Sequence, residues 1–438
     1  MNKKMMHPAD ILVCYMERIY QYGMTTTSGG NLSVLDENGD MWITPGGTDK
    51  GSMTREDIVC VKKDGTVIGK HKPSSEYPFH QKIYQANRKL KAVLHAHSPA
   101  LIAFSVVRKL PDTTLFPALY HTCGKVTSAK YAMTGSDELG EIIAAEFEKG
   151  CDITILENHG LVAAGESMEE AFLKFEALEF GAQIEMNTLS IRQKRAGTFP
   201  AGELSGIAQK DRRQMIEENI PASVCGEEKE IVFSEEEKKA GQELCRFIRR
   251  AYRQKLICGA WGSFSVRLDN NKFVMTAKKA DRGMIQEEDL VCIDGESREQ
   301  GKIPDAYWAL HQEIYREHPE INAVIVAQPV CVMAFAVKGQ ALNTRLIPES
   351  YMILQDTVLY RTEEYFAKPE KAAKNMKETD TLFLLENDAV LSVGKSLLQA
   401  FDRLEVSEYT AKAVISAMEI GTPVQIPEEQ IKSLRIIR

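Results

Sequence analysis

The sequence lacks paired cysteines. Its nine cysteines are scattered singly, and no two of them form a C-x-x-C motif. This spacing fits thiols that are kept reduced better than it fits a disulfide framework. We therefore expect a cytoplasmic protein.

The chain also has no excess of positive charge. Its formal net charge is −8 and its isoelectric point is near 5.8, so it presents no cationic field to nucleic acid or to an anionic membrane. With 438 residues, 44% hydrophobic and 26% charged, it reads as an ordinary globular protein long enough for more than one domain. Small molecules or other proteins are the expected partners.

No apolar stretch is long and uninterrupted. The longest runs from Ile321 to Val337 and is broken by two polar residues and a proline: Asn322, Gln328 and Pro329. A buried strand that leads into a helix explains this run better than a membrane span does. Near the amino terminus, Asp10 and Glu17 come too early for a secretory signal. We expect no membrane association.

An internal repeat organises the chain. Motifs of the first half recur 232 to 229 residues later, among them "GGNLSV" with "WGSFSV", "FHQKIYQANRKLKAV" with "LHQEIYREHPEINAV", and "ILENHG" with "LLENDA". Two tandem copies of one domain are predicted, over residues 1–222 and 234–438. The charged stretch from Glu217 to Glu237 is the predicted linker.

Each copy alternates helix and strand patterns. In the first copy we predict a helix that ends near Gly23, a helix that starts at "PSSE", and a buried strand over 92–97. Further elements are strands over 31–34, 41–44, 58–62 and 152–157, and helices over 136–149 and from 167 to about 189. This order predicts an α/β layered domain.

Two histidines alternate in the buried strand "AVLHAH". Side chains two residues apart point to the same face of a strand, so His95 and His97 can present two ring nitrogens to one metal ion. The alternative is a pair of buried, hydrogen-bonded histidines. The second copy keeps the apolar frame of the strand but has Val326 and Gln328 there, so the fold itself does not require imidazoles.

Comparison of the two copies also distinguishes candidate metal ligands from structural residues at other polar positions. His159 becomes Asp388 and Glu76 becomes Tyr307 in the second copy. His80 and Tyr120, in contrast, have the same residue type in both copies and are assigned structural roles. The residues lost together are three imidazoles and a carboxylate, a coherent ligand set for a divalent transition metal.

These motifs resemble the class II aldolase/adducin family. The matching segments of the first copy are "GGNLSV", "WITPGG", "PSSEYPFH", "AVLHAH", "YAMTGSDELGE" and "ENHGLVA". The resemblance implies a three-layer α/β/α domain in both copies. It implies one zinc ion, or another divalent metal, per chain, held by Glu76, His95, His97 and His159. It also implies a phosphate site at Asn31, Gly46, Gly47, Ser74 and Ser75.

Elementary chemistry favours the same phosphate site. A helix start offers free N–H groups and the positive end of a dipole to an anion, and two glycines let the backbone approach closely. The plainer interpretation is that Ser74 or Ser75 only caps the helix. The sequence departs from the family pattern at Gly46, where aldolases commonly have threonine, and at His121, where they have a catalytic tyrosine.

The reaction implied is metal-assisted cleavage or formation of a C–C bond in a small phosphorylated ketose, through an enediolate. Glu76 would carry the proton as acid and base, and His121 is the candidate donor to the leaving oxygen. Dehydratases, epimerases and decarboxylases of the family use a related site, and adducins are scaffolds without the ligands. Because family aldolases form fourfold rings, two tandem chains are expected to pair as a homodimer with four domains in a ring.

Overall fold

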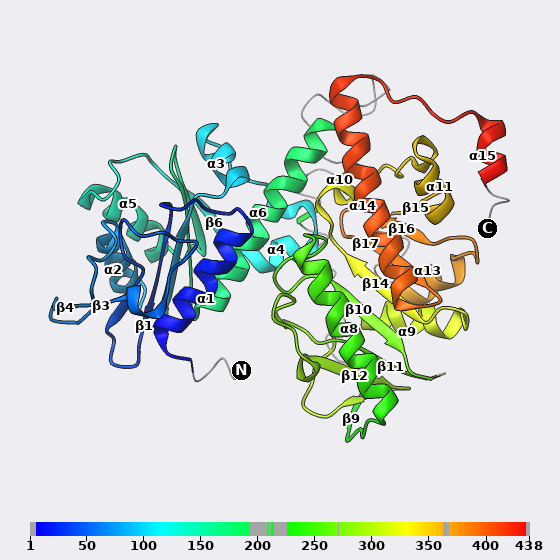
Figure 1. The fold of residues 1–438 in the computed structure, drawn as a ribbon, viewed down its shortest axis with the longest axis horizontal. Helices are drawn as coiled ribbons and strands as arrows, with labels where there is room; N and C mark the ends of the chain where they lie inside the picture. The colour runs from blue at the N-terminus through cyan, green and yellow to red at the C-terminus, as the bar shows by residue number, and fades with distance from the viewer. Residues whose placement is uncertain are drawn as a thin grey trace. The chain divides into compact units, whose positions relative to one another are not determined.

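The chain folds into two compact units (Figure 1). The computed structural model describes residues 6–191, 209, 212–213, 226–269, 271–361 and 368–434. The first unit comprises Met1–Thr113 and Leu119–Ala182, and the second comprises Thr114–Ala118 and Gln183–Arg438. The boundaries at 222 and 234 stay a prediction. Of the predicted linker, residues 217–225 lie outside the described residues, and the rest contains strand β9 and the start of helix α8.

The first unit is built on one mixed sheet of eight strands in the order β4-β3-β2-β1-β5-β8-β7-β6. Only the β6–β7 pair among them is parallel. The strands are β1 Asn31–Leu35, β2 Met41–Ile43, β3 Val59–Val61, β4 Val67–Ile68, β5 Ala92–Ala96, β6 Val126–Ala129, β7 Ile153–Leu156 and β8 Gly160–Gly165.

Helices cover both faces of this sheet, which confirms the predicted three layers (Figure 1). On one side lie α1 and α6, whose rings Tyr15 and Phe172 are 5.2 Å apart, and on the other lie α2 and α5. The helices are α1 Pro8–Gln21, α2 Tyr77–Ala86, α3 Pro99–Val106, α4 Pro117–Cys123, α5 Asp137–Glu148 and α6 Met168–Ser190, with 3-10 turns η2 Arg55–Asp57 and η3 Thr113–Leu115.

Strand register explains how polar side chains reach the α2 face. Val93 packs in the core cluster beneath α2 and α5. His95, two residues further along β5, therefore points to the same face. In the β1–β5 ladder Asn31 lies opposite His95 and Ser33 opposite Val93. The sheet thus gathers Asn31, Ser33 and His95 on one buried face at the end of β5.

The second unit repeats this plan. Its sheet has nine strands in the order β15-β16-β17-β14-β10-β11-β12-β13-β9. The strands are β9 Glu227–Lys229, β10 Ser263–Arg267, β11 Lys272–Thr276, β12 Leu290–Asp294, β13 Ser297–Glu299, β14 Ala323–Ala327, β15 Val358–Tyr360, β16 Leu382–Leu385 and β17 Ala389–Gly394. Strand β10 pairs with β14 as β1 pairs with β5, with Ser263 opposite Val326.

The helices of the second unit confirm the interpretation of the longest apolar run, which forms β14 followed by α10. They are α8 Glu235–Arg253, α9 Trp308–Glu317, α10 Val330–Val337, α11 Pro348–Leu354, α13 Pro369–Asn375, α14 Leu397–Ile420 and α15 Glu428–Leu434, with 3-10 turns η4 Glu287–Asp289 and η5 Thr344–Leu346. Among the described helices, none is both long and apolar enough to cross a membrane.

Candidate metal and substrate site

Three histidines of the first unit converge. His95 lies in β5, His97 follows the end of that strand, and His159 lies in the turn between β7 and β8. Because β8 pairs with β5, this turn is brought beside the two other histidines. One ring nitrogen of each lies within 4.8 Å of the others, and the Nε2 atoms of His95 and His97 are 2.9 Å apart.

The environment keeps these imidazoles neutral. Burial lowers the pKa of His95 to about 3 and that of His159 to about 4, and it also lowers the pKa of His97. His95 Nδ1 lies 2.7 Å from the carbonyl oxygen of Leu161, to which it donates. This bond leaves the lone pair of His95 on Nε2, toward the other two rings. Neutral imidazoles held by such a bond are the form that binds metals.

A carboxylate completes the cluster. Glu76 precedes α2 as its N-cap residue and is buried. Its Oε2 lies 3.4 Å from His95 Nε2, and its Oε1 lies 3.5 Å from His159 Nε2. Oε1 is buried without a hydrogen-bond partner among the described residues. A buried acceptor beside three neutral imidazoles is a donor set that fits a divalent metal ion.

A series of buried side-chain hydrogen bonds supports Glu76. Asn31 Nδ2 donates to Glu76 Oε2 at 2.7 Å, and Asn31 Oδ1 accepts from His80 Nε2 at 2.5 Å. His80 Nδ1 lies 2.7 Å from the hydroxyl of Ser33, which is itself 2.7 Å from the hydroxyl of Tyr84. Burial lowers the pKa of His80 well below its ordinary value, so the ring is neutral and has one donor and one acceptor.

Gly160 sets how closely the His159 turn approaches β5. A Cβ atom added to Gly160 would lie 2.6 Å from the carbonyl oxygen of Ala96 and 2.7 Å from the His97 ring. No side chain fits in that space. The absence of a side chain at Gly160 therefore allows His159 to come beside His97.

Four of the five predicted phosphate residues lie on two adjoining loops, and the fifth, Asn31, begins strand β1. An isolated bridge between Pro45 and Pro73 joins these loops. A Cβ atom on Gly46 would lie 3.6 Å from Ser74 Cα and 3.8 Å from the amide nitrogen of Ser75. Helix α2 begins at Tyr77, later than the "PSSE" motif suggested, and Ser74 accepts a hydrogen bond from the amide of Glu76 at 3.3 Å.

Gly47 is exposed, as are Gly46 and Ser75, and has a φ of +69°, a backbone conformation that favours glycine. His121 lies on α4, exposed, with its ring 5.5 Å from that of Tyr120. It is not one of the three clustered histidines.

The second unit keeps the support of this site but not its ligands. The hydroxyl of Ser265 lies 2.7 Å from His311 Nδ1 and 2.7 Å from the Tyr315 hydroxyl, which repeats the Ser33, His80 and Tyr84 arrangement. The positions of the ligands are taken by Tyr307, Val326, Gln328 and Asp388. The Tyr307 hydroxyl donates a hydrogen bond of 2.7 Å to Asp388 Oδ1.

Comparison with known proteins assigns both copies to one family. The model named Class II Aldolase and Adducin N-terminal domain matches residues 10–186 and again 242–415. The chain belongs to the class II aldolase/adducin family. It is a tandem repeat of the family domain, and the second copy lacks the three clustered histidines of the first.

Relatives of this family include enzymes of more than one kind. The chain is 38% identical over 182 residues to an L-fuculose phosphate aldolase of Methanococcus maripaludis, covering 41% of this chain and 96% of that protein. It is 33% identical over 204 residues to a 5-deoxy-D-ribulose 1-phosphate aldolase of Bacillus thuringiensis, with coverages of 45% and 92%. A 3-oxo-tetronate 4-phosphate decarboxylase of Escherichia coli is 32% identical over 169 residues, with coverages of 38% and 79%.

Solved structures of class II aldolases are also similar. An L-fuculose 1-phosphate aldolase matches with a TM-score of 0.40 at 29% identity, over 48% of this chain and 95% of that one. The L-fuculose 1-phosphate aldolase of Glaciozyma antarctica matches with a TM-score of 0.38 at 26% identity, over 48% and 81% of the two chains. The curated relatives described above, at 32% to 38% identity, are what support a class II sugar-phosphate aldolase family.

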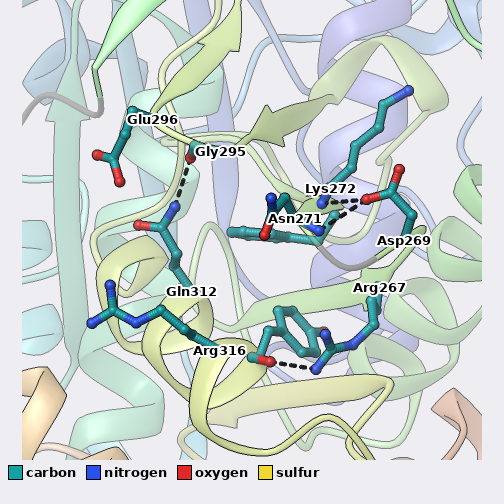
Figure 2. A pocket seen from close by; sticks show the side chains of 10 residues that line it. Arg267, Asp269, Asn271, Lys272, Gly295, Glu296, Gln312 and Arg316 are labelled. Carbon is teal, nitrogen blue, oxygen red and sulfur yellow. Dashed lines mark hydrogen bonds between the residues drawn. The ribbon is translucent and has the colours of Figure 1, made fainter.

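A cavity of about 270 Å³ lies elsewhere in the second copy of this aldolase-family domain (Figure 2). It adjoins Arg267, the last residue of β10, whereas Ser263 is the first residue of that strand. The Arg267 guanidinium donates to three carbonyls where α9 ends, those of Tyr315, His318 and Ile321. The other two cations of the cavity, Lys272 and Arg316, have carboxylate partners. We assign the cavity no role in the site.

Sequence reasoning missed two features of this aldolase-family site. It gave His80 a structural role, although the structure links His80 through Asn31 to Glu76. It also left Lys50 unremarked, although that lysine lies buried beside the Gly46 loop. The signal for Lys50 was the repeat itself, since the second copy has the cation Arg282 at the same place.

Proposed function

We propose that the first unit is a metal-dependent lyase that cleaves or forms a C–C bond in a small phosphorylated ketose. The observation that carries this proposal is the convergence of three neutral histidines and a buried carboxylate in a member of this family. Its similarity to two sugar-phosphate aldolases supports the choice of reaction and substrate class.

The proposed metal ligands are His95, His97, His159 and Glu76, and the ion is zinc or another divalent transition metal, one per chain. The bound ion would supply Lewis-acid stabilisation of negative charge that develops on substrate oxygens as the bond breaks. The histidines suffice to hold the ion if Glu76 turns toward the substrate. Glu76 can therefore serve both as a metal ligand and as a group that acts on the substrate.

Glu76 is the proposed acid–base group. Its Oε1 has no hydrogen-bond partner in the described part of the chain and can accept a proton from the substrate or return one. Its other oxygen is held by Asn31 at 2.7 Å, which fixes the plane of the carboxylate. The amide of Asn31 has a second N–H, so Asn31 can orient Glu76 and still donate to the substrate.

The substrate's phosphate would lie against Gly46, Gly47, Ser74 and Ser75, with Asn31 at its edge. Open backbone and hydroxyl groups are typical of phosphate sites. His121, in the place of the family's tyrosine, is the proposed donor to the leaving oxygen.

Decarboxylation is the second candidate reaction. Similarity to a 3-oxo-tetronate 4-phosphate decarboxylase favours it over the dehydratase and epimerase alternatives. Both reactions leave negative charge beside a carbonyl, so the same ligands and the same carboxylate would serve. An adducin-like scaffold is disfavoured, since the first unit retains a complete ligand set.

We further propose a homodimer whose four domains form a ring, in a reducing cytoplasm. The repeat and the eight free cysteines among the described residues support these two proposals. Light scattering at micromolar concentration should report twice the chain mass of 49.1 kDa. A monomer would contradict the assembly.

One panel of assays tests the proposed reaction. The metal-loaded chain is offered phosphorylated ketoses and 3-oxo acid phosphates, and the products are identified by mass spectrometry. Release of dihydroxyacetone phosphate and an aldehyde supports the lyase, and release of carbon dioxide supports the decarboxylase. If neither product forms while metal remains bound at the histidines, the proposed function is wrong.

A further inference from the structure

Lys50 is a buried cation without a counter-charge. Its side chain is 3% exposed, and its Nζ donates to the carbonyl oxygen of Pro45 at 2.7 Å. No carboxylate of the described residues lies within ion-pairing distance of it. Burial alone lowers its pKa to about 8. Buried charges are normally paired, because an unpaired one is costly to remove from water.

The location of Lys50 connects it to the proposed phosphate loops. Its acceptor, Pro45, adjoins Gly46 and is bridged to Pro73, next to Ser74. The amide of Ser74 donates to the carbonyl oxygen of Thr44, which fixes the two loops side by side. The hydroxyl of Thr48, in the same loop, is also buried without a hydrogen-bond partner among the described residues.

The second unit has an equivalent cation in Arg282. Arg282 is fully buried and donates through Nη1 to the carbonyl oxygen of Ala277, the counterpart of Pro45, at 3.1 Å. It also donates through Nη2 to Asp305 Oδ2 at 3.2 Å. The cation therefore keeps its place in both units, but only the second unit gives it a carboxylate.

The carboxylate stands where the first unit has Ser74. The amide of Asp305 donates to the carbonyl oxygen of Thr276, as that of Ser74 does to Thr44. Asp305 Oδ1 accepts from the amide of Tyr307 at 3.3 Å, as the Ser74 hydroxyl does from Glu76. The two residues are thus equivalent in their backbone bond and in the bond that their side chains accept. They differ in one negative charge.

We propose that Lys50 is the cation that binds the substrate's phosphate group, which occupies the place that the Asp305 carboxylate fills in the second unit. The second unit closes its own anion site with a side chain, whereas the first leaves that site to a ligand. This inference rests on the proposed function for the identity of the anion as a sugar phosphate. The site itself requires only a phosphoryl dianion, for which lysine serves as a point charge.

The test measures inorganic phosphate binding to the full chain by calorimetry. Wild type should bind phosphate at one site, and Lys50→Met should weaken binding by about 10- to 100-fold, the range for a hydrogen bond to a charged group. Lys50→Arg should retain most of the affinity. Ser74→Asp copies the second unit, and it should abolish binding because its carboxylate pairs with Lys50.

The matched variant lies in the second unit. Asp305→Ser removes the internal counter-charge of Arg282 and should create a second phosphate site in the same chain. Heteronuclear NMR of the lysine ammonium groups gives a readout on wild type, which does not depend on any variant folding. Phosphate should shift the Lys50 signal and leave that of Lys338, a buried lysine of the second unit, in place.

The inference is overturned if folded Lys50→Met binds phosphate as tightly as wild type, or if phosphate leaves the Lys50 signal unmoved. In that case Lys50 only secures the Pro45 carbonyl. Failure of the proposed function looks different. Phosphate would bind and depend on Lys50 and Ser74 as expected, but no phosphorylated sugar would be converted.

Discussion

Asn31 and Glu76 are joined by a hydrogen bond of 2.7 Å between Nδ2 and Oε2, across two elements far apart in the sequence. The bond makes the orientation of a proposed catalytic carboxylate depend on strand β1. His80 in turn fixes the amide of Asn31, because its Nε2–H donates to Asn31 Oδ1. The second unit, which has Ser263 and Tyr307 at these two positions, retains the histidine without the carboxylate.

We predict that His80→Phe lowers kcat by about 10- to 100-fold, the range found when a supporting partner of a metal-site residue is removed. The reason is that Asn31 loses its fixed amide orientation and no longer holds Glu76. KM should change little, because His80 contacts no proposed substrate residue other than Asn31. Steady-state kinetics and the metal content of the variant check both points.

His311→Phe is the matched control. It removes the same bond to a serine hydroxyl in the second unit, where no carboxylate depends on it. A similar loss of stability in both variants, with loss of kcat only in His80→Phe, is the expected result. Equal kinetics in the two variants would return His80 to a purely structural role.

Glu76→Gln should reduce turnover by about 10²- to 10⁴-fold, the contribution of one proton-transfer group, while the metal stays bound. Glutamine keeps the size and one oxygen of glutamate but cannot carry the proton. Tyr307→Phe, its counterpart in the second unit, should leave turnover unchanged. Near-normal turnover by a metal-loaded Glu76→Gln variant would require another base.

Metal content should be about one ion per chain, since only the first unit has three clustered histidines among the described residues. His97→Ala should lose the ion, and Gln328→Ala, at the same position of the second unit, should keep it. Elemental analysis after dialysis against a chelator and reloading gives the count. Two ions per chain, or none after reloading, would contradict the prediction.

The pKa of Lys50 predicts a change of stability with pH. Its folded-state pKa of about 8 lies below the ordinary value of 10.5. Between these pH values the unfolded chain binds more protons at Lys50 than the folded chain does. This lysine therefore makes the free energy of unfolding rise as pH rises from about 8 to 10.5, and the contribution is absent below pH 8.

Urea unfolding of wild type and Lys50→Met across this pH range checks the sign. Trp42 reports on the first unit when the other two tryptophans, Trp261 and Trp308, are changed to phenylalanine in both proteins. The difference between the two curves should grow in favour of wild type as pH rises. Parallel curves would show that the lysine titrates normally.

The sequence predicted much of the fold because its signals were local or repeated. A short apolar run before a proline marked β5, the long apolar run marked β14 and α10, and the repeat gave two copies of one domain. The gathering of His95 and His97 followed from the period of a strand. Their meeting with His159 depended on β8, a strand that was not predicted, because its sequence "GLVAAG" consists mostly of glycine and alanine, which are depleted in strands.

Hydrogen-bond partners were beyond the reach of sequence patterns. A buried histidine found in both copies indicates support for the fold, and nothing local shows that one copy bonds it to Asn31 and the other does not. Lys50 was missed for a similar reason. A lysine among "TDKGS" is expected at the surface, and only the structure shows that it is buried and has no carboxylate partner among the residues described.

Gly160 is a fourth requirement of the histidine cluster, beside its three imidazoles. Its counterpart Ala389 carries the methyl group that the first unit excludes, and Gln328 stands in place of the histidine ring that such a methyl would strike. Replacing Val326, Gln328 and Asp388 by histidine should therefore not suffice to rebuild the cluster, because the Ala389 methyl would occupy the space of a histidine ring at position 328. A second metal site in this chain requires Ala389→Gly as well, a change at a residue that binds no metal.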